Sequence, residues 1–187
     1  MELLSLTVGR LQENVYFLID ENKETLIFDP GAQAEDIKEL IEEEGLKPIA
    51  IVLTHAHGDH IGAVDELRKA YNIPMYMNEI EKEFLTNTDF NRSLYSNENI
   101  TVEPADGYYP AELGKWKIGS FEPELALIPG HSPGSTVFIF KDNGFVIGGD
   151  VLFKGSVGRS DFSYGSHMTL MAGIEQYLLP LPGNTVV

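Results

Sequence analysis

The feature that most constrains this chain is a continuous apolar run, Pro48–Leu53, followed closely by the segment His55-Ala-His57-Gly-Asp59-His60. An apolar run of this length predicts a β-strand that is buried on both faces. Open α/β sheets place their ligand sites at the carboxyl ends of such strands. Imidazole and carboxylate groups are good ligands for divalent zinc, iron or manganese. The segment therefore predicts a metal site at the end of a buried strand.

Two further metal-competent residues follow strands in the second half of the sequence. His131 follows a predicted strand that ends near Ile128, and Asp150 follows the apolar segment Phe145–Gly148. Residues far apart in sequence are therefore expected to converge on one rim, where the two carboxylate oxygens of Asp150 suit a bridge between two metals. His167 has no metal-competent neighbour in sequence, and we assign it to the surface.

The pattern of apolar residues predicts alternating strands and helices. Period-two and continuous apolar runs predict strands, and spacings of three and four predict helices. Asp142-Asn-Gly144 indicates a hairpin turn. This alternation predicts the α/β fold class, with two packed sheets and helices outside them. The predicted strands are 3–8, 14–19, 25–28, 48–53, 73–77, 116–119, 125–128, 135–141 and 145–148, with another beginning at 185–187, and the predicted helices are 34–43, 60–71 and 168–178.

The length and charge of the chain limit its surroundings and partners. A chain of 187 residues is within the usual size of one domain. Its net charge of -16 disfavours binding to nucleic acid and to anionic membranes.

The sequence has no apolar run of the roughly 20 residues that span a membrane and no secretory leader pattern, so we expect a cytoplasmic protein. The absence of cysteine excludes disulfides, zinc–thiolate sites and a cysteine nucleophile. Nothing in the sequence indicates an oligomeric state.

The motifs together resemble the metallo-β-lactamase superfamily. The segment from His55 to His60 has the pattern H-x-H-x-D-H, and Asp29-Pro-Gly, Gly130-His-Ser-Pro-Gly and Gly148-Gly-Asp follow the family's order. The branch that the sequence resembles most is the glyoxalase II-like, or hydroxyacylglutathione hydrolase-like, group, especially its short members. The resemblance implies a four-layer αββα sandwich with the metals at one edge.

The resemblance also implies a ligand set. One metal would take His55, His57 and His131, a second would take Asp59 and His60, and Asp150 would bridge them. Two divalent ions are implied, with zinc expected and iron or manganese as alternatives. Asp29 would orient a ligand histidine, which typically tunes metal affinity. The alternative is that Asp29 serves only as a turn residue before Pro30-Gly31.

The sequence departs from the family pattern at its end. The family supplies another histidine to the second metal from a Gly-His-Gly segment after the last strand. This sequence ends at Val187, where that segment would be expected, and no histidine follows His167. We therefore expect residues 1–187 to form one domain that is truncated at its C-terminus, with an incomplete second metal site.

The resemblance implies hydrolysis by metal-activated water, with a thioester such as a hydroxyacylglutathione as the expected small-molecule substrate. Asp59 would orient the attacking hydroxide and accept its proton. Arg159 stands where the glyoxalase II family has a basic residue that helps to bind the glutathione moiety. The family's next aromatic position is Asp161 here, so a loop ion pair between Arg159 and Asp161 is the alternative. Lys154 and Tyr164 are further substrate-binding candidates.

Other functions share the same motifs. A mononuclear iron oxygenase of the persulfide dioxygenase kind would use His55, His131 and Asp150. A metal-binding domain with little activity would result if the second site were incomplete. Lactonases, phosphodiesterases and nucleases also carry the core motif. A β-lactamase is less expected, because the cysteine ligand of some of those enzymes is absent and the second-half motifs resemble glyoxalase II more closely.

Overall fold

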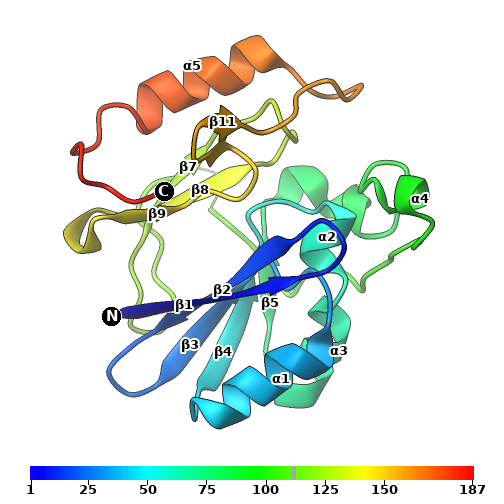
Figure 1. Ribbon diagram of the computed structural model, residues 1–187, viewed down its shortest axis with the longest axis vertical. Helices are drawn as coiled ribbons and strands as arrows, with labels where there is room; N and C mark the ends of the chain where they lie inside the picture. Colours follow the sequence, from blue (N-terminus) through cyan, green and yellow to red (C-terminus); the bar gives the residue numbers. More distant parts are fainter. Residues whose placement is uncertain (111–112) are drawn as a thin grey trace. The chain divides into compact units, whose positions relative to one another are not determined.

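The computed structural model of the chain describes residues 1–110 and 113–187. It divides into two compact units, one formed by Met1–Met77 with Glu81–Tyr108 and the other by Asn78–Ile80 with Tyr109–Val187. Each unit combines a β-sheet with helices (Figure 1), which confirms the predicted α/β class. That residues 1–187 act as a single domain stays a prediction.

The first unit contains a six-stranded sheet in the order β1-β2-β3-β4-β5-β6. The pairs β1–β2 and β2–β3 are antiparallel, whereas β3–β4, β4–β5 and β5–β6 are parallel. The central strands are fully buried at Ile27, Ile51 and Val52, as their apolar sequences predict. The strands are β1 (Glu2–Val8), β2 (Glu13–Ile19), β3 (Glu24–Phe28), β4 (Lys47–Val52), β5 (Met75–Met77) and β6 (Gly107–Tyr108).

The helices α1 (Ala34–Glu43) and α3 (Val64–Tyr71) lie side by side next to this sheet (Figure 1). They bury their apolar faces through Ile37, Ile41 and Leu67. The short helices α2 (Gly58–Ile61) and α4 (Ser93–Ser96) and the 3-10 helix η1 (Glu79–Leu85) complete the helical segments of this part of the chain.

The predicted helix at 60–71 is wrong in one respect, because it is broken between α2 and α3. The break lets Gly62 approach the loop that follows β3. A Cβ on Gly62 would lie 2.3 Å from the carbonyl oxygen of Gly31. The backbone N–H of Ala63 donates to the carbonyl of Pro30 at 3.0 Å. Helical periodicity carries no information about these contacts, which join Gly62 to Gly31 and Ala63 to Pro30, segments far apart in sequence.

The second unit contains a three-stranded antiparallel sheet, in the order β7 (Glu124–Leu127), β8 (Thr136–Phe140) and β9 (Phe145–Ile147). The 3-10 helix η2 (Lys141–Asn143) and Gly144, whose φ is 73°, form the predicted connection between β8 and β9. Helix α5 (His167–Tyr177) packs against this sheet (Figure 1), with Leu170 and Ile174 in a shared apolar core. A small hairpin, β10 (Leu152–Phe153) and β11 (Ser156–Val157), follows β9.

Two strand predictions in the second unit do not hold as made. The segment 116–119 makes only an isolated bridge between Ile118 and Phe121, because the chain turns back at once through Gly119, whose φ is 57°. At 185–187, Val186 makes one isolated parallel bridge to Phe145 and no strand. Among the described residues, none of the helices has both the length and the apolar character needed to cross a membrane.

Candidate metal centre

The loop that follows β4 is held in place by two buried carboxylates. The backbone N–H of Thr54 donates to Oδ1 of Asp29 at 2.7 Å. The backbone N–H of Ala56 donates to the carboxylate of Glu81 at 2.6 Å. Asp29 is 3% exposed and Glu81 is fully buried. The peptide groups around His55 are therefore fixed by acceptors from two other segments. Sequence reasoning missed Glu81, because it lies 25 residues from Ala56 and belongs to no motif.

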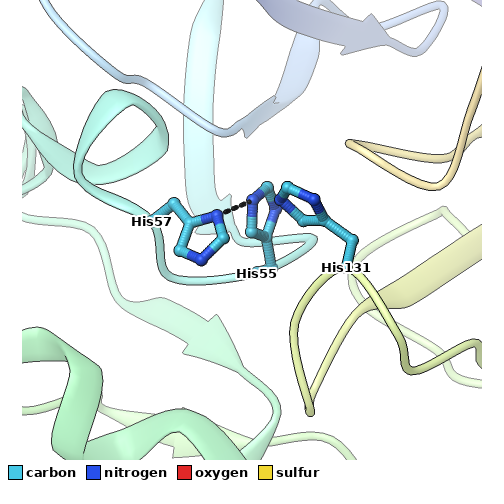
Figure 2. Close-up of side chains that lie close together, drawn as sticks. All are labelled: His55, His57 and His131. Atoms are coloured by element: carbon cyan, nitrogen blue, oxygen red, sulfur yellow. Dashed lines mark hydrogen bonds between the residues drawn. The ribbon is translucent and has the colours of Figure 1, made fainter. Parts of the chain in front are cut away.

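A chain of hydrogen bonds sets the protonation of His55. The Thr54 hydroxyl donates to Oδ2 of Asp29, because an ionised carboxylate only accepts. The same hydroxyl oxygen lies 3.0 Å from Nδ1 of His55, so this ring nitrogen carries the proton and donates. Nε2 of His55 then carries the lone pair, and it lies 3.1 Å from Nδ1 of His57 (Figure 2). The imidazole ring of His55 is therefore neutral and presents an unprotonated Nε2, which is the form that binds a metal.

Asp29 also contacts a predicted ligand directly. Its Oδ2 lies 3.1 Å from Nδ1 of His60, and both side chains are 5% exposed. A carboxylate on one ring nitrogen directs the other nitrogen towards a metal and raises its basicity. One ligand atom from each of Asp29, His55 and His60 lies within 4.8 Å of the others. The alternative, in which Asp29 is only a turn residue, does not account for these contacts, although its φ of 50° does fit a turn.

Asp59 is the accessible acidic residue of the run from His55 to His60, which is called the histidine-rich loop below. Its side chain is 30% exposed, and its Oδ2 lies 3.8 Å from Nε2 of His60. Both residues belong to α2, which packs tightly against the loop after β3. A Cβ on Gly31 would lie only 1.5 Å from the carbonyl oxygen of Asp59. The glycine of the Asp29-Pro-Gly motif is therefore required by the backbone that presents Asp59.

The second unit contains a matching histidine and carboxylate pair. Nε2 of His131 lies 3.4 Å from Oδ2 of Asp150. Nδ1 of His131 lies 2.8 Å from the carbonyl oxygen of Arg159, which can only accept, so Nδ1 donates and Nε2 carries the lone pair. Gly158 allows this packing, since a Cβ there would lie 1.8 Å from the carbonyl oxygen of Asp150. His131 is 3% exposed.

The separations within these pairs fit metal ligation. Tetrahedral zinc with bonds of about 2.0–2.1 Å places its ligand atoms about 3.3 Å apart. The observed separations are 3.1 Å for His55 and His57, 3.8 Å for Asp59 and His60, and 3.4 Å for His131 and Asp150. The donors are imidazole nitrogens and carboxylate oxygens, which zinc, iron and manganese accept. The residues present therefore fit a divalent metal.

The substrate-binding candidates of the second unit either contact residues near them in sequence or are exposed. Nε and a terminal nitrogen of Arg159 donate to the two carboxylate oxygens of Asp161 at 3.0 and 2.9 Å. Asp161 thereby raises the pKa of the Arg159 guanidinium above its usual range. The ion pair between Arg159 and Asp161, which the sequence offered as the alternative to substrate binding by Arg159, is present. Tyr164 packs against Phe162, with 5.7 Å between the ring centroids, and Lys154 and His167 are exposed.

The architecture and the donor set define a metal-binding α/β protein, and the comparisons identify its family. A model of the metallo-beta-lactamase superfamily matches residues 8–187. The chain therefore belongs to the metallo-β-lactamase superfamily, as its motifs predict, and is a metallo-hydrolase of that superfamily.

Individual relatives agree with this assignment. The chain is 44% identical to the probable metallo-hydrolase YqgX of Bacillus subtilis, over 100% of this chain and 88% of the relative. It is 32% identical to the hydroxyacylglutathione hydrolase GloC of Haemophilus influenzae, over 100% of this chain and 89% of the relative. The crystal structure of the BLEG-1 B3 metallo-beta-lactamase is similar with a TM-score of 0.94 and 40% identity, covering 99% of this chain and 90% of that one. The predicted metallo-β-lactamase fold is thereby confirmed.

Proposed function

We propose that this chain hydrolyses thioesters of the hydroxyacylglutathione class. The observation that carries the proposal is the contrast between Asp59 and His60, neighbours in the histidine-rich loop. His60 is 5% exposed and held by Asp29, whereas the Asp59 carboxylate is 30% exposed. An accessible carboxylate beside fixed metal ligands can accept the proton of an attacking water. The similarity to a hydroxyacylglutathione hydrolase supports the choice of a thioester.

The ligand assignment follows the order of the family's motifs. His55, His57 and His131 would hold one metal, Asp59 and His60 the second, and Asp150 would bridge them. Zinc, iron and manganese are the candidates for both positions. Asp29 would act through His60, whose Nδ1 it contacts, and not as a ligand of its own.

In the proposed reaction, the attacking water would be activated by the metal and Asp59 would accept its proton. When bound, a metal lowers the pKa of a water ligand from about 15.7 to about 7. Asp59 orients the attacking oxygen and accepts its proton. The oxygen forms a bond to the thioester carbonyl carbon, the carbon–sulfur bond breaks, and the thiolate leaves with the electron pair. Because a thiol has a pKa of about 8.5, this leaving group needs no strong protein acid.

The test compares Asp59→Asn and Asp59→Ala with wild type, using release of thiol from lactoylglutathione as the assay. The asparagine variant keeps the size of the side chain and removes the proton acceptor, so kcat should fall by roughly 10²–10⁴-fold. The alanine variant should lose metal occupancy and turnover together. Asp142→Asn, an exposed change in η2, is the matched control. Unchanged turnover in both Asp59 variants would contradict the proposal.

A second candidate, hydrolysis of β-lactams, rests on the similarity to the BLEG-1 B3 metallo-beta-lactamase. The same attacking oxygen and the same Asp59 would act on a strained amide carbonyl. Opening of a chromogenic cephalosporin, measured beside the thioester assay on the same metal-loaded preparation, separates the two. Turnover of the cephalosporin without turnover of any thioester would replace the first proposal by the second.

A further inference from the structure

A cavity of about 600 Å³ in the first unit adjoins Asp59. Its walls come from the β1–β2 turn, the loop after β3, the start of α2, and the segment around α4. Sites for small molecules have volumes of roughly 300–1,000 Å³, so this one is large enough for a peptide-sized thioester. Asp59, which we place at the reacting centre, is among the residues that line this cavity.

Two of the 13 lysine and arginine residues of this acidic chain, Arg10 and Arg92, line this one cavity. Arg92 is held in place, with its guanidinium carbon 3.8 Å from the ring centroid of Tyr95 and one nitrogen 3.8 Å from Asp89. Arg10 differs, because within residues 1–110 and 113–187 its side chain makes no ion pair and no hydrogen bond. A guanidinium that lines a cavity and has no protein partner is suited to a ligand anion.

The turn that carries Arg10 is fixed by hydrogen bonds. The backbone N–H of Gly9 donates to Oε1 of Gln33 at 2.7 Å, and the N–H of Gln12 donates to the carbonyl of Gly9 at 3.3 Å. Gln33 also donates to Asp36 in the first turn of α1. The turn is therefore closed by its own backbone hydrogen bond and anchored through Gly9 to the start of α1, which reduces the entropy cost of presenting the guanidinium.

The net negative charge of the chain makes the two arginines of this cavity significant for anion binding. A net charge of -16 repels anions in general, so an anionic ligand needs local cations. The two acidic residues that line the cavity are Asp59, which we assign to the metal, and Glu98, which accepts a hydrogen bond from Ser96 at 2.8 Å. Leu11, 73% exposed, supplies apolar surface beside Arg10.

We propose that this cavity binds the carboxylate-bearing thiol part of the thioester substrate, with Arg10 as the carboxylate anchor. The inference rests on the proposed thioester hydrolysis and specifies its substrate class. It assigns to Arg10 the anion-binding role that the sequence suggested for Arg159, whose guanidinium is paired with Asp161. Arg10 determines specificity in this account and takes no part in the bond-breaking step.

The test uses lactoylglutathione and its diethyl ester, in which both carboxylates are masked. Arg10→Gln should raise KM for lactoylglutathione by about 10-fold or more, with kcat changed by less than about twofold, because a bond made equally in ground and transition states affects KM alone. The KM for the diester should be the same in wild type and R10Q. Arg10→Lys, which keeps the charge but not the paired geometry, should lie between them.

Binding without turnover provides an independent readout. S-propylglutathione, a thioether that cannot be hydrolysed, should bind wild type about 10-fold more tightly than R10Q by titration calorimetry. Lys69→Gln removes one charge from the exposed face of α3 and should change neither KM nor binding. Thermal melting checks that each variant is folded, and if R10Q were not, R10K would carry the comparison.

The outcomes separate the two proposals. If wild type hydrolyses both thioesters and R10Q leaves the KM for lactoylglutathione unchanged, the cavity assignment is overturned and the thioesterase stands. If wild type hydrolyses neither thioester, the proposed function fails, and the thioether titration alone decides the cavity. Equal binding of the thioether to wild type and R10Q would overturn the role of Arg10 in either case.

Discussion

Oδ2 of Asp29 lies 3.1 Å from Nδ1 of His60 and also accepts the hydroxyl of Thr54, while Oδ1 accepts the backbone N–H of Thr54. One carboxylate thus connects the end of β3, the loop after β4 and helix α2. The three groups that face it all donate, so an ionised carboxylate satisfies each of them. Asp29 therefore ties the geometry of the histidine-rich loop to the sheet beneath it.

Replacing Asp29 by asparagine should weaken both the fold and the metal site. Asparagine offers one acceptor oxygen to three donors and adds an N–H₂ group that faces them. One buried donor is then left without an acceptor, at a cost of about 1–3 kcal/mol in the free energy of unfolding. Loss of the carboxylate behind His60 should lower metal affinity by about 10–100-fold. Urea unfolding and competition with a chelator measure the two effects, and Asp29→Asn with both values unchanged would contradict the role given to Asp29.

Glu81 should matter although no motif contains it. Glu81→Ala removes the acceptor for the buried N–H of Ala56, so the free energy of unfolding should fall by about 1–3 kcal/mol or more. Glu81→Gln keeps one acceptor oxygen and should recover part of the loss. Chemical denaturation of both variants checks this order. Equal stability of the alanine and glutamine variants would show that the hydrogen bond to Ala56 is not what Glu81 contributes.

Gly31 should tolerate no side chain, because its Cβ would lie 1.5 Å from the backbone carbonyl oxygen of Asp59. The backbone cannot yield as a flexible side chain can, so Gly31→Ala should cost about 1–3 kcal/mol in stability, or more, and displace Asp59. Gly183→Ala, where a Cβ meets nothing within 4 Å, is the matched control. Thermal melting of the two variants provides the comparison, and equal melting temperatures would refute the steric argument.

The parts of this fold that sequence alone predicts are those with a local signal. The apolar run before Thr54 predicts β4, and helical spacing predicts α1 with the bounds that the structure has, Ala34–Glu43. The ion pair between Arg159 and Asp161 is equally local, since it joins residues two apart. In each case the pattern lies within one segment, so no knowledge of tertiary packing is needed.

The features that sequence could not predict depend on contacts between distant segments. Glu81 contacts Ala56 across 25 positions, and the break between α2 and α3 accompanies the close approach of Gly62 to Gly31. The cavity beside Arg10 is assembled from four segments, and the two that supply its arginines, the β1–β2 turn and the segment around α4, carry no recognisable motif. Tertiary packing overrides helical periodicity at the break, and it brings together side chains whose spacing in the sequence is uninformative.

The central claim is that the run from His55 to His60 holds a divalent metal. Elemental analysis of purified wild type and of His55→Ala/His57→Ala, after equal exposure to zinc and removal of excess, tests it most directly. Wild type should retain at least one zinc per chain, and the double variant should lose most of it while keeping its fold by circular dichroism. Equal zinc content in the two folded proteins would contradict the claim.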